Sequence, residues 1–464
     1  MKRILIRSGK SPFRVASQEE FIQQDLIGTN SGNLLFSDAT YKILLTQDTE
    51  LTSNGLKTVP TAERAKEINE QYDAFVIPLA NAFRPSFRAS LDRMSTLIEQ
   101  LTIPVVVLGV GAQVNENYDT KRLAPMELSV KRFVRAVLER SPSIGVRGEL
   151  TASYLKDLGF NDVDIIGCPS MFMYGETFPR PRDPGFIDSS SRIGINLSPG
   201  AVSVGDVAAL ARNAYERFPD LTYFAQNLAD AELLFWGDTS SGVTAGRDKG
   251  LPRRMTHPLF QENKVRVPLD PRTWLEELAT HDFVYGTRIH GNIAPLLAGT
   301  PSVVLVHDSR TLELCRYYDI PHRMLRGLPG DIHPRDLYEE ADYGPLLSNH
   351  RERWDRFKGF LDRNGLENTF SHGDGGAAYD ARVAALKLPP PVSVWDSSDD
   401  GALRYRFSRL HERLAQAERS VLALTAQNKE LMKRLTTMER RMSADGSRIG
   451  PAIRRRVRKM RPHG

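Results

Sequence analysis

Six consecutive residues, Gly286-Thr287-Arg288-Ile289-His290-Gly291, place a permanent cation and a titratable imidazole two positions apart. They follow Asp282 to Tyr285, which predicts a strand, and precede Asn292 to Ala298, which predicts a helix ending at Gly299. The N-terminus of a helix has unsatisfied backbone N–H groups and a partial positive charge. An arginine and a histidine at such a junction therefore predict an anion-binding site.

Three more polar side chains follow predicted strands in the first half of the chain: Gln113 after Val105–Gly109, Arg147 after Ser143–Val146, and Ser170 after Val163–Ile166. In open parallel sheets, ligands bind beyond the carboxyl ends of the strands, so these side chains are candidates for ligand contacts. Taken alone, Gly109 to Gln113 is more often a structural Gly-rich turn than a functional one, and Arg147 is better explained by a surface ion pair with Glu149.

Two further segments offer polar groups at similar places. Gly28 to Asn33 precedes an apolar run and resembles a loop-to-helix cradle for a phosphate or sugar, with Asn30 and Asn33 as its amides. His307-Asp308 follows an apolar run, although a surface histidine beside a helix-capping Asp308 explains it nearly as well. None of these turns is a P-loop or a complete dinucleotide fingerprint, which disfavours nucleotide hydrolysis and NAD chemistry.

Short apolar runs alternate with segments of helical periodicity, which is typical of βαβ units and a parallel sheet. The predicted strands are Lys42–Leu45, Ala74–Pro78, Val105–Gly109, Ser143–Val146, Val163–Ile166, Arg192–Leu197, Leu221–Ala225, Val265–Val267, Phe283–Tyr285 and Ser302–Val306. The predicted helices between them are Ala62–Gln71, Ala89–Gln100, Glu127–Arg140, Glu149–Leu158, Val204–Arg217, Thr273–Thr280 and Leu312–Tyr318. The pattern predicts an α/β fold of two doubly wound Rossmann-like domains that face a cleft.

The expected domains are an N-terminal Rossmann-like domain over residues 1–180 and a C-terminal one over residues 191–345, joined by a Pro- and Ser-rich segment. Residues 346–369 contain a predicted helix that returns to the first domain. Residues 370–402 have the Gly- and Pro-rich composition of a linker. A coiled coil over residues 403–443 and a basic tail over residues 444–464 are expected to follow.

The coiled coil is predicted from a heptad repeat of mostly apolar residues: Leu403, Phe407, Leu410, Leu414, Ala417, Val421, Leu424, Asn428, Leu431, Leu435, Met438 and Met442. Asn428 occupies an a position, where a polar Asn favours a parallel two-stranded pairing. A single amphipathic helix packed on the body would not need such a sustained period. We therefore expect a homodimer.

The composition, 41% hydrophobic and 26% charged residues over 464 positions, is that of a soluble globular protein. The longest apolar stretches are too short to span a bilayer, and the basic start Met1 to Ile6 lacks the features of a signal peptide. A cytoplasmic location is therefore expected. Cys168 and Cys315 are too few for a disulfide framework, and no Cys/His cluster has the spacing of a zinc site, so two buried thiols and no metal are expected.

The net charge of +5 comes from the tail, because Arg448 to the end carries seven Lys or Arg and no acid, leaving 55 bases against 57 acids elsewhere. Such a tail can bind anionic lipid, nucleic acid or only solvent. The interspersed apolar residues favour lipid headgroups, so we expect a peripheral location at the inner face of the membrane and no nucleic-acid partner.

Four motifs, in this order, resemble the polysaccharide pyruvyl transferase family: Ser143–Thr151, Ile166–Ser170, Gly286–Gly291 and Ala298–Pro301. The resemblance implies a fold like that of two-domain glycosyltransferases of the B type. It also implies transfer of the pyruvyl group of phosphoenolpyruvate onto two hydroxyls of a cell-surface sugar, as a cyclic ketal. The donor-contacting residues it implies are Arg147, Arg288 and His290, with Ile289 beside them.

This chemistry suits the residue types. Two guanidinium groups can hold a carboxylate and a phosphate, and an imidazole can move protons near neutral pH, so Arg288 and His290 are the expected catalytic residues and no cofactor is required. The expected substrate-binding residues are Arg147, Ile289, Asn30, Asn33, Gln113, Ser170 and Asp308. The expected partners are phosphoenolpyruvate and a polysaccharide or glycolipid sugar, with a lipid-linked acceptor as one form. The alternatives are a nucleotide-sugar-dependent glycosyltransferase, with Glu313 as its candidate nucleoside ligand, and a non-catalytic glycan-assembly scaffold.

Overall fold

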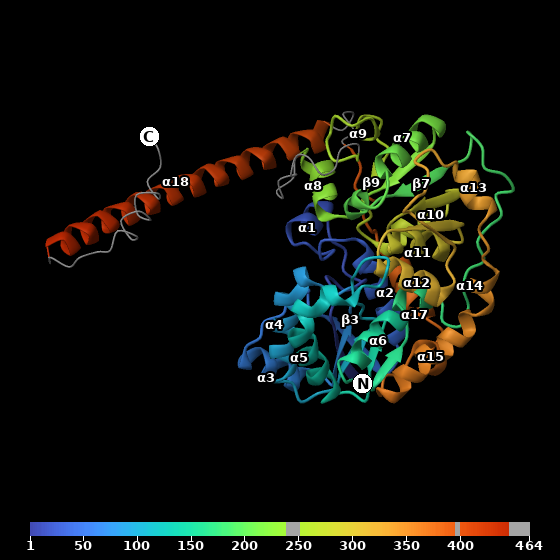
Figure 1. The fold of residues 1–464 in the computed structure, drawn as a ribbon, viewed down its shortest axis with the longest axis horizontal. Helices are drawn as coiled ribbons and strands as arrows, with labels where there is room; N and C mark the ends of the chain where they lie inside the picture. Colours follow the sequence, from blue (N-terminus) through green and yellow to red (C-terminus); the bar gives the residue numbers. More distant parts are fainter. Residues whose placement is uncertain (238–250, 395–399, 445–464) are drawn as a thin grey trace. The chain divides into compact units, whose positions relative to one another are not determined.

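The structure, a computed structural model, describes residues 1–237, 251–394 and 400–444 (Figure 1). The chain divides into a globular unit that reaches residue 395 and a second unit that contains the C-terminal helix. The globular unit is built on two parallel β-sheets, each formed by one half of the sequence.

The first sheet has the strand order β2-β1-β3-β4. The bounds of these strands are Thr49–Ser53 (β2), Lys2–Ile6 (β1), Ala74–Pro78 (β3) and Val105–Leu108 (β4). A parallel bridge between Val110 and Val146 continues this order to the pair β5 (Ile144–Val146) and β6 (Val163–Ile165). The order reverses between β1 and β3, so a crevice is expected beyond the carboxyl ends of these two strands.

The second sheet has the strand order β12-β11-β10-β7-β8-β9. Its strands are His322–Met324 (β12), Ser302–Val306 (β11), Phe283–Gly286 (β10), Ile193–Asn196 (β7), Leu221–Phe224 (β8) and Val265–Arg266 (β9). The order reverses between β7 and β10, where Gly286 pairs with Asn196. Only glycine fits there, because a Cβ on Gly286 would lie 2.0 Å from the backbone oxygen of Asn196. A ligand crevice is therefore expected beyond these two strand ends as well.

Helices pack against the sheets of both halves (Figure 1). In the first half they are α1 (Gln18–Gln23), α2 (Gly32–Leu44), α3 (Ala62–Gln71), α4 (Arg88–Ile98), α5 (Glu127–Leu138) and α6 (Glu149–Asp157). In the second half they are α7 (Val207–Arg217), α8 (Leu228–Trp236), α9 (Pro258–Gln261), α10 (Pro271–Leu278), α11 (Ile289–Leu297), α12 (Ser309–Tyr318) and α13 (Pro334–Glu339). Two doubly wound parallel layers facing a cleft confirm the predicted α/β, glycosyltransferase-B-like fold class.

Alternate residues of the first sheet enter two different apolar cores. Leu5, Phe75 and Ile77 pack with α3, α4 and α5, whereas Ile4 and Val76 belong to a core that continues into the second half of the chain. Because both faces are covered, these strands are apolar throughout rather than alternating, as is typical of buried parallel sheets.

Helix α2 lies between the two halves, and its side chains from Leu34 to Leu44 are all buried (Figure 1). The predicted strand at Lys42–Leu45 is wrong, because Lys42 to Leu44 form the last turn of this helix. A helix buried on all sides lacks the polar face by which periodicity identifies a helix. The strands β1 and β2 were not predicted by the sequence analysis; β2 forms the edge of the sheet, and β1 lies between β2 and β3.

Four helices follow the second sheet: α14 (Gly344–Ser348), α15 (His350–Arg363), α16 (Thr369–His372) and α17 (Ala377–Ala384). Helix α15 returns to the first half, where Phe357 stacks on Phe172 at a centroid distance of 4.7 Å. Residues 370–394, within the segment 370–402 that was expected to be a linker, are part of the globular unit. Tyr379 in α17 is buried, and Val392 pairs with Val267. Alternating apolar positions in a short helix are easily mistaken for linker sequence when Gly and Pro surround them.

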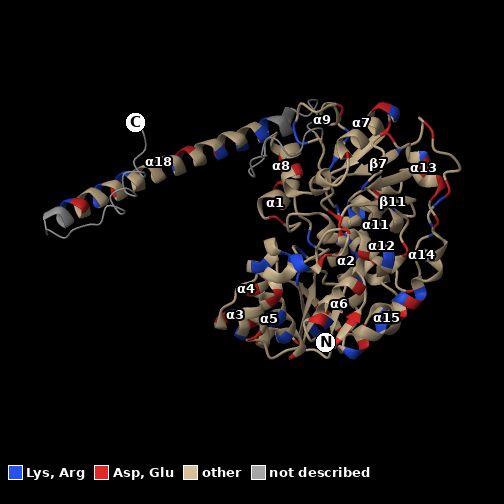
Figure 2. Cartoon of the chain, in the orientation of Figure 1, with Lys and Arg blue, Asp and Glu red and all other residues tan. Residues whose placement is uncertain are grey.

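The second unit contains helix α18 (Asp400–Ala444), which carries charged residues of both signs along its length (Figure 2). The predicted helix over residues 403–443 is therefore present, whereas its pairing with a second copy is untested. The basic tail, from residue 445 onward, lies outside the described residues. In the described parts of the chain, no helix is long and apolar enough to cross a membrane.

Candidate active site

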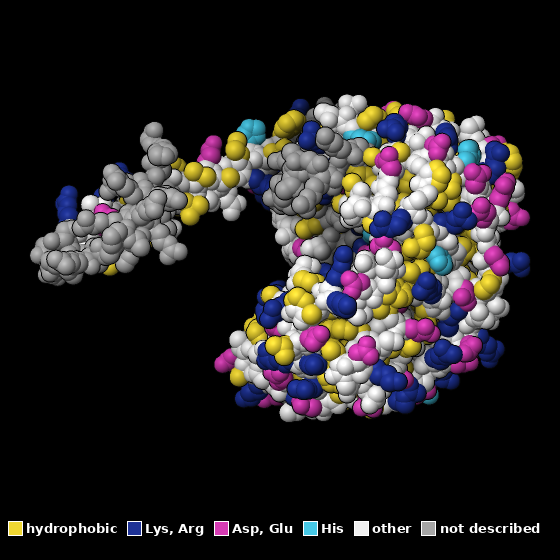
Figure 3. Space-filling view, viewed as in Figure 1, with side chains coloured by type: hydrophobic (Ala, Val, Ile, Leu, Met, Phe, Trp, Pro, Cys, Tyr) yellow, Lys and Arg dark blue, Asp and Glu magenta, His cyan; other side chains and the backbone are white. Residues whose placement is uncertain are grey.

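A cleft of about 1270 Å³ lies between the two layers, bordered by the loops after β1, β3, β7, β8, β10 and β11 (Figure 3). Both points at which strand order reverses open into it, through Arg7 and Leu79 in the first half and Ser198 and Arg288 in the second. Seven arginines and three carboxylates are among its described lining residues. The cleft is therefore suited to an anionic ligand.

The turn from β10 into α11 is held by side-chain hydrogen bonds. The backbone N–H of Arg288 donates to Asn196 Oδ1 at 2.9 Å, and Arg288 Nε donates to the backbone oxygen of Leu197 at 3.0 Å. Helix α11 begins at Ile289 rather than at the predicted Asn292, so Arg288 is its N-cap residue. Ile289 and His290 consequently lie in the first helical turn, and both line the cleft.

The His290 side chain is only 8% exposed and lies between the two halves of the molecule. Its Nε2 atom is 3.4 Å from Cys168 Sγ, and its ring lies 5.6 Å from the ring of Phe36 in α2. Burial lowers the pKa of His290 to about 3, and the positive charges of Arg147 and Arg310 contribute to the same shift. The imidazole is therefore neutral near pH 7.

Arg147, which follows β5, is 1% exposed and yet lines the cleft. Its backbone N–H donates to Val110, but its side-chain Nε and Nη2 atoms have no hydrogen-bond partner in the described protein. Burial lowers the pKa of this guanidinium. A buried cation with two unused N–H donors is costly to maintain. Its position therefore indicates that a ligand oxygen completes the site.

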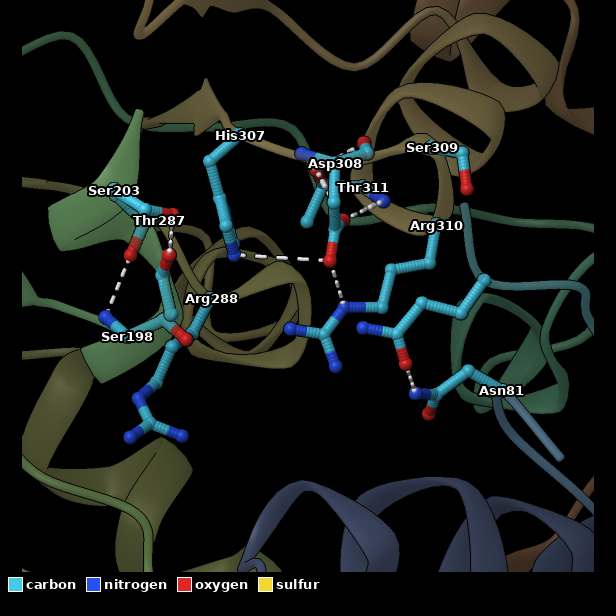
Figure 4. A network of polar contacts seen from close by, with 12 residues as sticks. Asn81, Ser198, Ser203, Thr287, Arg288, His307, Asp308, Ser309, Arg310 and Thr311 are labelled. Atoms are coloured by element: carbon cyan, nitrogen blue, oxygen red, sulfur yellow. Dashed lines mark hydrogen bonds and ion pairs between the residues drawn. The ribbon is translucent and has the colours of Figure 1, made fainter. Parts of the chain in front are cut away.

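Arg310, in the first turn of α12, is a cleft residue that the sequence analysis missed. Arg310 Nε donates to Asp308 Oδ2 at 2.5 Å, and His307 Nε2 lies 3.7 Å from the same carboxylate, so both side chains converge on Asp308 (Figure 4). Asp308 also caps α12 through Thr311. Asp308 and Thr311 form a capping box shortly after a predicted strand. This sequence signal marks the N-terminus of a helix at the cleft, and it could therefore have identified Arg310 as a cleft residue.

Asp308 was expected to bind substrate, and it does line the cleft. Burial alone would raise its pKa, but Arg310, His307 and the hydrogen bonds from Thr311 bring the pKa below the usual value. His307 is itself kept neutral, because burial lowers its pKa to about 4. Asp308 is therefore a carboxylate that fixes Arg310 and His307.

Arg147 and Arg288, the two arginines expected to hold the donor, both line the cleft. The charges that act on the His290 ring are those of Arg147 and Arg310. Arg288 lines the same cleft, but the carboxylate with the largest effect on its pKa is Asp230 in α8. Arg310 is thus a further cation whose charge acts on His290, and Arg288 lines the same cleft.

Asn30, Asn33 and Gln113 all line the cleft as predicted. Asn33 Nδ2 donates to the backbone oxygens of Ile27 and Gly28 at 3.0 and 2.8 Å, so this amide fixes the loop itself. Asn30 Oδ1 accepts from the N–H of Gly32, and Gln113 Oε1 accepts from Asn81. These amides shape the rim of the cleft.

Ser170 and Glu313 do not border the cleft. Ser170 is fully buried, and its hydroxyl lies 3.1 Å from Cys168 Sγ. Glu313 accepts from the backbone N–H and the hydroxyl of Thr151 at 2.8 and 3.1 Å, so it joins α12 to α6. Burial raises the pKa of Glu313 to about 7. Ser170 follows a predicted strand, and Glu313 follows the start of a predicted helix. Tertiary packing turns both side chains into the interior.

Gly32, at the start of α2, gives the first testable prediction. A Cβ on Gly32 would lie 2.9 Å from both Cβ and Nδ1 of His290. Gly32→Ala is therefore expected to displace the imidazole and to lower the turnover of the expected pyruvyl transfer about tenfold. Phosphoenolpyruvate, the expected donor, should still protect this variant against thermal unfolding. Gly200→Ala is the matched control, because a Cβ there meets only Ser198 Oγ at 3.9 Å in the same cleft. Equal turnover of the two variants would contradict the assignment of His290.

The chain was compared with known proteins. A family model described as polysaccharide pyruvyl transferase matches residues 30–309, which include Arg147, Arg288, His290 and Asp308. A search of curated protein sequences returned no match.

Several solved structures are similar over most of the chain. A UDP-GlcNAc 2-epimerase of Methanocaldococcus jannaschii, in complex with UDP-GlcNAc and UDP, is 10% identical, with a TM-score of 0.42 and coverage of 78% of this chain and 99% of its own. A UDP-N-acetylglucosamine 2-epimerase of Rickettsia bellii is 11% identical, with a TM-score of 0.41 and coverage of 79% and 96%. The HepE protein of Anabaena, in complex with UDP and glucose, is 12% identical, with a TM-score of 0.38 and coverage of 79% and 97%.

Proposed function

The chain belongs to the polysaccharide pyruvyl transferase family, and from this membership we propose that it transfers the pyruvyl group of phosphoenolpyruvate onto two hydroxyls of a cell-surface polysaccharide or glycolipid sugar. The product would be a cyclic ketal. The observation that carries the choice of donor is the buried Arg147 side chain, whose Nε and Nη2 atoms have no protein partner. A small ligand with a carboxylate and a phosphate supplies acceptors for such donors.

The donor would lie against Arg147 and Arg310, with His290 between them and the α2 N-terminus. Each of these guanidinium groups can bind a carboxylate or a phosphate with two parallel hydrogen bonds. The bound anion would offset the two positive charges that lower the pKa of His290 in the empty cleft. Donor binding would therefore make the ring easier to protonate.

In the proposed reaction, neutral His290 accepts the proton of the first sugar hydroxyl while the hydroxyl oxygen bonds to C2 of phosphoenolpyruvate. The proton is delivered to the methylene carbon, which becomes the methyl group of the product. The second hydroxyl then bonds to C2, its proton leaves with the phosphate, and the C2–O bond to phosphate breaks. Arg147 and Arg310 stabilise the charge on the departing phosphate.

Thermal protection distinguishes this proposal from a nucleotide-sugar-dependent transferase. The purified full chain is heated with phosphoenolpyruvate, with UDP-sugars, or alone, and its unfolding midpoint is measured. Phosphoenolpyruvate is expected to raise the midpoint, because a ligand that binds only the folded state stabilises it. Label from [¹⁴C]phosphoenolpyruvate should then appear as acid-labile pyruvate on glycans of the source cells. Protection by UDP-sugars alone would contradict the proposed donor.

We also propose that the chain forms a homodimer through a parallel coiled coil of α18. The heptad side chains Leu414, Leu424 and Leu431 are 55 to 59% exposed in the single chain, and apolar side chains are visible along the helix (Figure 3). A second copy would cover this seam.

Leu424→Arg is expected to convert the dimer to a 52.1 kDa monomer, because it places a charge in the seam. Ala426→Arg, at a position on the opposite side of the helix in the heptad register, should leave the dimer intact. Sedimentation equilibrium of the full chain and the two variants measures the mass. A monomeric wild-type chain at micromolar concentration would refute the proposed dimer.

A further inference from the structure

The Nε2 nitrogen of His290 lies next to a cysteine. Cys168 Sγ lies 3.4 Å from His290 Nε2 and 3.1 Å from the Ser170 hydroxyl. Cys168 is 2% exposed and does not border the cleft. The thiol is thus a neighbour of the imidazole on its buried side. It has no access to a ligand.

The loop that carries Cys168 is fixed by Tyr318 of α12. The backbone N–H of Cys168 donates to the Tyr318 hydroxyl oxygen at 2.8 Å, and the same hydroxyl lies 3.1 Å from the backbone oxygen of Cys168. Gly167 has a φ of +73°, and a Cβ there would lie 2.0 Å from the Tyr318 hydroxyl. These contacts fix the backbone of Cys168 relative to α12. Its thiol is therefore held against the imidazole ring of His290.

The other ring nitrogen, Nδ1, is on the side of Gly32 and Asn30. A Cβ on Gly32 would lie 2.9 Å from this nitrogen, and Asn30 borders the cleft. A contact at Nε2 leaves Nδ1 as the nitrogen that can exchange a proton with a ligand. The partner at Nε2 therefore decides which of the two ring nitrogens exchanges a proton in the proposed reaction.

We propose that Cys168 is a positioning residue for His290, sharing a hydrogen bond with Nε2 that turns Nδ1 toward the cleft. This inference rests on the proposed function, because it assigns the orientation of the imidazole that the pyruvyl transfer uses.

The choice of a thiol has a chemical consequence. The charged groups that face the ring are Arg147 after β5 and Arg310 on α12, and the ring of Phe36 on α2 is the other neighbour. A carboxylate in place of the thiol would add a negative charge and favour the imidazolium. A thiol orients the ring without that charge, so His290 stays a proton acceptor until an anion binds beside Arg147 and Arg310.

The test reads the ring directly in the full chain without phosphoenolpyruvate. Histidine is labelled with ¹³C at Cε1, and the His290 signal is assigned as the one missing from His290→Asn. Cys168→Asp is expected to raise the pKa of His290 by about 1 to 3, because it creates an opposite charge beside the ring. Cys168→Ser, which keeps a hydrogen-bonding group, should retain the wild-type signal, whereas Cys168→Val should shift or broaden it.

Cys315→Val is the matched control, since Cys315 is also fully buried but belongs to the core face of α12. It is expected to leave the His290 signal and its titration unchanged. The proposal is overturned if Cys168→Val and Cys168→Asp both leave them unchanged. Thermal melting confirms that each variant is folded, and Cys168→Val decides the question if Cys168→Asp does not fold. Failure of phosphoenolpyruvate to protect the chain would reject the donor assignment without affecting this readout.

Discussion

Arg147→Met is expected to abolish protection by phosphoenolpyruvate and, at the same time, to raise the unfolding midpoint of the empty protein. The guanidinium has two N–H donors without protein partners, and each would bond to the anion. Charge-assisted hydrogen bonds contribute about 1.5 to 3 kcal/mol each, so losing two should weaken donor binding about 10²- to 10⁴-fold. Methionine has a similar length and fills the buried site without N–H donors that lack partners, which removes a desolvation penalty.

Calorimetric titration with phosphoenolpyruvate and thermal unfolding measure the two effects separately. Arg353→Met is the matched control, because Arg353 is also buried but is paired with Asp319 and with the backbone oxygen of Tyr318. This control should lose stability and keep its affinity. If Arg147→Met loses stability and binds phosphoenolpyruvate as tightly as wild type, then Arg147 has a structural role and the proposed donor site is wrong.

His290→Asn is expected to lower turnover about 10²- to 10⁴-fold, the contribution typical of a positioned acid–base group. Binding of phosphoenolpyruvate should change little, since the arginines remain in place. The unfolding midpoint should also change little, because the neutral ring makes only a weak polar contact with a thiol, and asparagine keeps a polar group at this position. Release of phosphate and transfer of labelled pyruvate to glycan measure turnover.

The control for this variant is His281→Asn. His281 is fully buried, packs 5.2 Å from the ring of Phe224, and does not border the cleft. Burial lowers the pKa of His281 to about 4, so it resembles His290 in protonation state. The control is expected to lose stability and keep turnover. Wild-type turnover in His290→Asn would remove the imidazole from the mechanism.

The order of strands and helices was largely predictable because its signals are local. Runs such as Ala74–Pro78 and Ser302–Val306 are apolar on both faces and end at turn residues, and both are strands with the predicted bounds. Helix α3 likewise has its predicted bounds, since one face is apolar and Thr61 caps it. Prediction failed for α2, where burial on every side removed the periodic contrast between a helix and a strand.

The candidate site was partly predictable for the same reason. Arg147, Arg288, Ile289 and His290 follow strands, and in a parallel sheet all such positions lie at one edge. The sequence could therefore place them at a common cleft. The sequence could not show that Ser170 differs from these cleft residues, because Ser170 also follows a strand. The packing of its loop around Tyr318 turns the Ser170 hydroxyl inward.

The amino-acid pattern alone thus established an α/β chain with an Arg and a His at a strand–helix junction, because strand, turn and helix signals are carried by neighbouring residues. The folded arrangement established which groups surround His290. Arg147 and Arg310 supply the charges, and Cys168 supplies the contact at Nε2. These three residues come from different strands and helices, so their meeting depends on how the two halves pack, a relation between distant parts of the chain that no local pattern contains.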